Sequence, residues 1–431
     1  MNSQDKIFHR RAWPNWIWLL LSVAACLCMW RYGSYVWASG QPAHFSDLYA
    51  SWWAAHESLL HHRDPYSLQV CREIQSRIYG APVTGAQPGS PAERAGGFAY
   101  PLYFVFLLYP VMAIPFATVK VIFDVLLPLL LVLMLGLWLF VLGWRPGPSR
   151  FTVLALFVLG SFPAMQGLWL QNPSVIAAFF VAAALASIAA SRLIPGGILL
   201  ALATIKPHFV FLLLLWLGIW TVREWRRRQP LAWSFFATMS LLLLGSEWLD
   251  TGWVRHFITV AWAYTHYTFG RSLLEVWFGA GVGLAVAVAV MTGILVLCSQ
   301  LRASLPQRPE FALACSLLLA ATVLVIPTIE PHAQLLLLPG ILLLLQKQAT
   351  GRAQHRLTRL FSAALWMLLI WGWIFAAGLS LASLKLNSSV LQKFWMLPLY
   401  TSPLIPLGLL LVLLRIYFEV RMSKRKEASA E

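Results

Sequence analysis

Asp47 is an acid placed where it could do chemistry at a membrane surface. It lies in the run His44-Phe-Ser-Asp-Leu-Tyr49, shortly after a long apolar stretch, and is one of only 16 acids in the chain. A carboxylate at the mouth of a membrane cavity can act as general base on a hydroxyl, because partial desolvation raises its pKa. Ser-Asp before a helical pattern is also a capping signal. The sequence therefore leaves a catalytic base and a helix cap as alternatives for Asp47.

A second candidate is the short turn from Pro327 to His332, which joins two very apolar stretches. Glu330 and His332 lie among prolines in very little polar sequence. An acid beside a histidine in such a place indicates a site, and a capped helical hairpin is the alternative. We treat His332 as a candidate catalytic residue and Glu330 as a candidate sugar or acceptor contact.

Lys206 and His208 flank Pro207 between two short apolar runs. A lysine buried at membrane depth is unfavourable unless it is paired, so it marks an anion or a transport pathway by default. A lipid-linked phosphate would suit Lys206, with His208 beside it. A structural pairing with a backbone carbonyl or with an acid such as Glu330 is the alternative.

Further binding candidates lie in two other polar connections. Arg271 belongs to an aromatic-rich loop at about 250–277 and could hold a phosphate by two parallel hydrogen bonds. Any interfacial loop has a similar composition. Gln171 and Asn172 form a turn whose amides could bond sugar hydroxyls, although helix capping by Asn172 is the simpler explanation.

Three tyrosines in the longest polar connection are candidate sugar or acceptor contacts: Tyr49, Tyr66 and Tyr100. The motif Arg63-Asp-Pro-Tyr66 is typical of a turn that Asp64 initiates and the proline fixes. Tyr100-Pro101 could equally be an interfacial aromatic residue before a helix that begins with proline.

Membrane helices must position these residues. Of 431 residues, 59% are hydrophobic, and only 32 Lys and Arg and 16 Asp and Glu carry charge. A soluble protein of this size needs far more charge to cover its surface. The apolar runs are continuous, which excludes a β-barrel, and their total length matches roughly twelve spans of about 20 residues. The predicted class is an all-α polytopic membrane protein of about 12 segments; a soluble enzyme, a disulfide scaffold and a coiled coil are excluded.

Ten long apolar stretches and two short ones make up these segments. The short runs, at about 195–205 and 208–222, are predicted to meet at a turn because a proline follows Lys206. The long stretches lie at about 16–38, 119–143, 151–166, 173–191, 231–249, 278–299, 310–327, 333–346, 360–381 and 397–418.

The distribution of basic residues sets the orientation. With both termini in the cytoplasm, most Lys and Arg fall inside, which accounts for the net charge of +16 without a nucleic-acid partner. The long connections then face outward, and the first, at about 39–118, contains a predicted amphipathic helix from Leu48 to Leu60. The apolar segment that ends at Phe116 is too short and too rich in proline to cross.

Taken together, these motifs resemble glycosyltransferase family 87, whose members have the membrane fold of the C superfamily and take sugar, mostly mannose, from a polyprenyl-phosphate donor. The likeness extends over about 45–340. It rests on Asp47-Leu-Tyr, Arg63-Asp-Pro-Tyr66, Tyr100-Pro101 with Pro110, Gln171-Asn172, the run from Gly196 to Lys206-Pro207, and His332 with Pro339. The chain departs from many relatives at Leu102, where they have a second proline.

The resemblance implies that residues 1–431 form one integral-membrane glycosyltransferase domain and that Asp47 activates the acceptor hydroxyl. A histidine at the position of His332 lies near the donor phosphate in family members. We expect transfer of a hexose, with inversion, to a lipid or glycan on the outer face of a bacterial inner membrane. A transporter or flippase of lipid-linked sugars and a non-catalytic scaffold are the alternatives. With no clustered carboxylates, neither a metal nor another cofactor is predicted.

Overall fold

A computed structural model describes residues 15–40, 46–83, 89–268, 270–327, 330–349, 356–391, 394 and 397–428. All regular structure in these ranges is helical. His44 and Phe45 lie outside them, as do Thr328 and Ile329.

Among the described residues, four helices are long and apolar enough to cross a membrane: α1 (Asn15–Gly40, over Trp16–Ser34), α5 (Phe116–Val141), α14 (Ala280–Ser299) and α17 (Arg356–Ala382). A fifth span results if the bent pair α6 (Pro148–Leu159) and α7 (Phe162–Trp169) is counted as one. Four shorter apolar helices are α8 (Ser174–Ala189), α9 (Leu193–Ala203), α10 (Pro207–Arg223) and α15 (Pro309–Val325). The chain is therefore an all-helical, polytopic membrane protein. The number twelve stays a prediction.

The predicted stretch at 151–166 is not one helix, because α6 and α7 meet at an angle of 60°. Pro163 lies in the first turn of α7, where its missing N–H is tolerated, and it cannot continue α6. At the break, a Cβ on Gly160 would lie 2.5 Å from the sulfur of Cys26 in α1. The bend thus follows from a proline and from the close approach of α1.

The first long connection folds into short helices and turns. It contains α2 (Asp47–His61), α3 (Leu68–Tyr79), η1 (Pro91–Arg94), α4 (Phe104–Leu107) and η2 (Tyr109–Val111). The predicted amphipathic helix is α2, one face of which is buried. Only α4 and η2 occupy the apolar segment before Phe116, so the structure has no long helix there.

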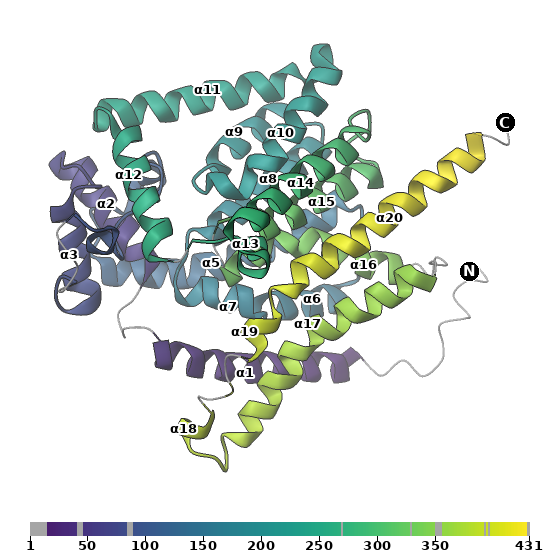
Figure 1. The fold of residues 1–431 in the computed structure, drawn as a ribbon, viewed down its shortest axis with the longest axis horizontal. Helices are drawn as coiled ribbons and strands as arrows, with labels where there is room; N and C mark the ends of the chain where they lie inside the picture. Colours follow the sequence, from purple (N-terminus) through teal and green to yellow (C-terminus); the bar gives the residue numbers. More distant parts are fainter. Residues whose placement is uncertain are drawn as a thin grey trace.

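The remaining elements complete the bundle. They are α11 (Trp225–Leu249), α12 (Trp253–Tyr267), α13 (Leu273–Phe278), η3 (Pro331–Leu337), α16 (Leu338–Ala349), α18 (Ser388–Leu391), α19 (Leu397–Thr401) and α20 (Leu404–Ala428). In Figure 1, α2, α3 and α12 gather on one side of the molecule, while α1 begins and α20 ends on the opposite side. The helices α8 and α15 are the most completely buried, and the many alanines of α8 allow α5 and α9 to pack closely against it.

Close packing of α9 on α11 depends on Gly197. A Cβ there would collide with the hydroxyl of Ser234 and would lie 2.8 Å from the backbone nitrogen of Phe235. We expect Gly197→Ala to lower the free energy of unfolding by about 1–3 kcal/mol, because an extra carbon in a packed interface forces the backbones apart. Thermal unfolding in detergent measures it. Gly218→Ala in α10 is the matched control, since no atom lies within 4 Å of its added Cβ, and an equal effect of both variants would contradict the packing argument.

Candidate active site

Four segments that are far apart in the sequence converge at the start of α2. The backbone N–H of Asp47 donates to the carbonyl of Leu170, at the end of α7, over 2.9 Å. The segment η3 packs against α7 and α8, and the turn between α9 and α10 contributes Lys206. This convergence brings together five of the predicted site residues: Asp47, Asn172, Lys206, Glu330 and His332.

The Asp47 carboxylate is held by an amide instead of capping a helix. Its Oδ2 accepts a hydrogen bond from Nδ2 of Asn172 at 2.5 Å. The other amide atom, Oδ1, accepts from the backbone N–H of Ser174 at 2.8 Å, which fixes the orientation of the amide. Ser46 is the cap residue of α2, and its hydroxyl donates to Gln171 Oε1 at 3.0 Å. Asn172 therefore bonds the first N–H of α8 from the position before the cap residue Pro173, and it is also the partner of Asp47.

The surroundings of Asp47 favour its neutral form more than water does. Burial raises the pKa of its carboxyl above the ordinary value of 3.8, and the negative charge of Glu330 adds to the rise. The Asn172 hydrogen bond and the positive charges of His332 and Lys206 act in the opposite direction without cancelling it. A carboxylate in this state is a stronger base than a solvated one.

Glu330 joins Lys206 and His332 in the cluster. Its Oε2 lies 2.9 Å from Nζ of Lys206 and 2.8 Å from Nε2 of His332. Burial alone would raise the pKa of Glu330, but the charges of Lys206 and His332 outweigh it and hold that pKa well below the usual range. The pairing of Lys206 with Glu330, one of the two alternatives in the sequence, is present. Lys206 is 4% exposed and has two further N–H groups for another anion.

Two residues that the sequence did not indicate complete this cluster. Gln166 in α7 places Oε1 3.3 Å from Nδ1 of His332, so both ring nitrogens face oxygen atoms. Tyr264 in α12 donates its hydroxyl to Glu330 Oε1 at 3.4 Å. A lone amide at the end of an apolar stretch was the only signal for Gln166. Tyr264 was one of several aromatic residues in its loop.

Tyr100 lies beside the charged cluster, and Tyr66 holds the backbone of Tyr100 by a hydrogen bond. The Tyr100 ring centroid is 5.7 Å from Nζ of Lys206, within the range of a cation–π contact, and Phe209 is at 5.1 Å. The hydroxyl of Tyr66 donates to the backbone carbonyl of Tyr100 at 2.7 Å. As predicted, Asp64 forms the turn before Tyr66, because its Oδ1 accepts from the Tyr66 N–H at 2.7 Å. An aromatic wall beside a lysine is suited to a sugar ring next to its phosphate.

Two candidate sugar contacts are engaged in packing. Tyr49 stacks edge-on against Phe116 with ring centroids 4.9 Å apart and is part of an aromatic group in α2. Gln171 is 2% exposed and donates to the carbonyl of Lys120 and, at 2.6 Å, to Asp124 Oδ1. These bonds fasten the turn before α8 to α5. Both residues position the start of α2 in this structure.

The two remaining phosphate candidates differ in their placement. His208 lies beside the cluster at the start of α10, and its Nε2 is buried without a hydrogen-bond partner among the described residues. Arg271 is exposed between α12 and α13, and within the described ranges no ion pair joins it to Glu330 or Asp47. The structure thus brings His208, but not Arg271, to the other charged groups.

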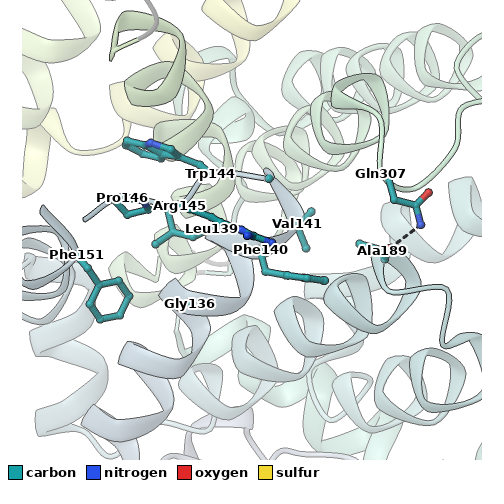
Figure 2. Close-up of a pocket in the computed structure, with 11 residues that line it drawn as sticks. Gly136, Leu139, Phe140, Val141, Trp144, Arg145, Pro146, Phe151, Ala189 and Gln307 are labelled. Carbon is teal, nitrogen blue, oxygen red and sulfur yellow. Dashed lines mark hydrogen bonds between the residues drawn. The ribbon is translucent and has the colours of Figure 1, made fainter. Parts of the chain in front are cut away.

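Two cavities lie away from this cluster. One, of about 430 Å³, is lined by the turn between α5 and α6, including Arg145 and Trp144, and by Gln307, which donates to the carbonyl of Ala189 at 2.7 Å (Figure 2). The other, of about 760 Å³, is lined mainly by apolar residues of α10. Neither contains a carboxylate or a residue of the Asp47 cluster. The candidate active site is therefore defined by its charged side chains.

The fold is all-helical and membrane-spanning, and a buried carboxylate, a lysine, a histidine and aromatic rings meet at one convergence. These features define an integral-membrane protein with a candidate acid–base site. Residues 98–327 match the model of glycosyltransferase family 87, so the chain belongs to this family and is a membrane glycosyltransferase. Asn172 and Lys206 lie within the matched range, whereas Asp47, Glu330 and His332 lie outside it. Comparisons with curated proteins and with solved structures found no match.

Proposed function

We propose that this glycosyltransferase moves a hexose from a polyprenyl-phosphate donor to a hydroxyl of a lipid or glycan acceptor, with inversion. The proposed hexose is mannose. The observation that carries the proposal is the juxtaposition of a carboxylate of raised pKa with the Lys206–Glu330–His332 cluster. A base and an anion-binding cation side by side are what a direct displacement of a phosphate leaving group requires.

In the proposed step, Asp47 accepts the proton of the acceptor hydroxyl while the oxygen of that hydroxyl forms a bond to the anomeric carbon of the sugar. The bond between that carbon and the phosphate oxygen breaks, and its electron pair leaves with the polyprenyl phosphate. Lys206 stabilises the developing negative charge, helped by His332 if its ring carries a proton. Asn172 holds the Asp47 carboxylate in place through its amide. No cofactor or metal takes part in this proposed step.

The proposed location is the outer face of a bacterial inner membrane, with both termini in the cytoplasm. The positive-inside distribution of Lys and Arg supports it. The start of α1 and the end of α20 also lie on the side of the molecule opposite to α2 and α12 (Figure 1). A lipid-linked donor fits this location, because it would bring an activated sugar to the outer face, where the proposal places the Asp47 cluster.

The donor class can be tested with purified protein in lipid nanodiscs. We expect transfer of labelled mannose from polyprenyl-phosphate mannose to lipid extracted from bacterial membranes, and no transfer from a nucleotide-linked mannose. The described residues of the site offer one lysine and no group of acids with metal-ligand spacing for a diphosphate. Product is counted after chromatography, with boiled protein as the control. Transfer from the nucleotide sugar alone would contradict the proposed donor, and transfer of another hexose alone would replace mannose.

A further inference from the structure

Asp64, Asp250 and His256 form a second group of polar side chains, outside the candidate active site. Asp64 lies in the turn between α2 and α3, Asp250 directly follows α11, and His256 is the fourth residue of α12. The histidine Nδ1 is 3.0 Å from Asp250 Oδ2 and 3.7 Å from Asp64 Oδ2. One ligand atom of each residue lies within 4.8 Å of the others. Three residues spread over the chain thus converge on one small volume.

The charges of this group are balanced only in part by the protein around it: His256 and Arg94 attract the Asp64 carboxylate, whereas Asp250 repels it. Two carboxylates face one imidazole, and like charges at this separation repel each other. Arg94 attracts Asp64 without forming a close ion pair with it or with Asp250 among the described residues, because its guanidinium donates to the carbonyl of Tyr66 at 2.6 Å. A divalent cation among the three side chains would remove the repulsion.

The ligand atoms are oriented by contacts behind them. Oδ1 of Asp64 accepts from the Tyr66 N–H, which leaves Oδ2 directed at His256. The residue after His256, Phe257, packs on the ring of Tyr66 with centroids 6.3 Å apart. Outer contacts of this kind hold metal ligands in place and are a regular part of metal sites.

We propose that Asp64, Asp250 and His256 bind one divalent zinc ion that fastens the first long connection to α12. One imidazole nitrogen and two carboxylate oxygens are zinc ligands, and bonds of about 2.0–2.2 Å in a tetrahedron place ligand atoms about 3.3–3.6 Å apart. The distances of 3.0 and 3.7 Å from His256 to the two carboxylates bracket that spacing. The side chains of Asp64 and His256 are 33% and 39% exposed, so water can take the fourth position.

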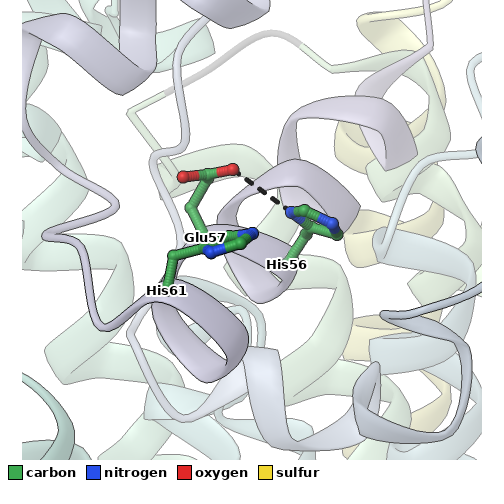
Figure 3. A group of neighbouring side chains, drawn as sticks. All are labelled: His56, Glu57 and His61. Atoms are coloured by element: carbon green, nitrogen blue, oxygen red, sulfur yellow. Dashed lines mark hydrogen bonds and ion pairs between the residues drawn. The ribbon is translucent and has the colours of Figure 1, made fainter.

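A competing triad in α2 is less suited to a cation. His56, Glu57 and His61 also bring their ligand atoms within 4.8 Å, and Figure 3 shows the Glu57 carboxylate joined to His56. However, Oε2 of Glu57 already pairs with the guanidinium of Arg63 at 2.5 Å. A metal ion there would meet a fixed positive charge. This triad therefore supplies the control.

The zinc would affect the candidate active site indirectly, by holding neighbouring residues in place. It would hold Asp64 and hence the turn that carries Tyr66, whose hydroxyl supports Tyr100 beside Lys206. The sequence predicted no metal because it has no clustered carboxylates, and these three ligands are far apart along the chain. The proposed zinc is structural and lies apart from the sugar-transfer step.

Zinc content tests the proposal without any sugar donor. Tag-free protein is stripped with EDTA, incubated with zinc, desalted and analysed by plasma mass spectrometry. We expect about one zinc per chain in the wild type and in His61→Ala, and almost none in His256→Ala, because loss of one of three ligands removes most of the affinity. Zinc should also raise the Tm of the first two proteins.

The isosteric variant Asp250→Asn is a second test of the site that keeps the proposal testable even where His256→Ala does not fold. It should retain the wild-type circular dichroism spectrum and still lose the zinc. A wild type without zinc, or loss of zinc in His61→Ala with retention in His256→Ala, would overturn the proposal. Failure of the sugar-transfer assay would not affect it, so the two proposals fail separately.

Discussion

Replacement of Asp47 by Asn should lower kcat for sugar transfer by about 10²–10⁴-fold, the usual contribution of a general base. The variant keeps the size of the side chain but cannot accept the acceptor proton. Burial raises the pKa of the Asp47 carboxyl and so disfavours its charged form. Because the neutral asparagine removes this buried charge, the fold should tolerate the substitution. The measurement is the initial rate of mannose transfer at equal amounts of folded protein, and KM for the donor should change little.

Asp124→Asn is the matched control for this prediction. Asp124 also carries a carboxylate bonded to an amide, with Gln171 Nε2 at 2.6 Å, but it lies in α5 outside the charged cluster. An asparagine there can still accept that hydrogen bond, and the rate should stay within a few-fold of the wild type. If Asp47→Asn transfers sugar as fast as Asp124→Asn, Asp47 is not the base.

Lys206→Met should have the second largest effect, on both stability and activity. It leaves Glu330 buried without its principal cation, and breaking a buried pair lowers the free energy of unfolding by about 3–5 kcal/mol. It also removes the proposed partner of the leaving phosphate, for which a loss of about 10²–10³-fold in kcat is expected. Thermal unfolding and transfer rate are measured on the same preparation.

The double variant Lys206→Met/Glu330→Gln separates these two roles of Lys206. Removing both charges should restore most of the stability, because no unpaired carboxylate remains. Activity should stay low if Lys206 binds the phosphate. Recovery of both stability and transfer would mean that Lys206 only pairs with Glu330, the structural alternative that the sequence left open.

The local features of the candidate site were predictable from the sequence. Pro207 after Lys206 indicated a turn between two short helices, and α9 and α10 meet there. Capping signals and amphipathic spacing placed the start of α2 at Asp47 within one residue. The sparse charge of an apolar chain made Glu330 a natural partner for Lys206. The turn and the helix start depend on residues that are neighbours along the chain. The pairing of Lys206 was predictable because few acids are present to pair with it.

Contacts between distant segments were not predictable in the same way. Gln171 and Tyr49 are residue types that often bind sugars. In the structure, however, Gln171 fastens the turn before α8 to α5, and Tyr49 packs on Phe116. The group of Asp64, Asp250 and His256 has no motif, because its members are brought together only when α12 packs beside the first connection. Composition identifies candidate side chains, whereas the packing of helices decides which of them meet.

The most direct test of the central claim is the pH dependence of kcat in the wild type and in Asp47→Asn. Burial raises the Asp47 pKa, and a base works only when deprotonated, so wild-type transfer should fall as pH drops through an apparent pKa above 3.8. The residual transfer of Asp47→Asn should lack this decline. The same decline in both proteins would show that another group titrates, and would contradict the assignment of Asp47 as the base.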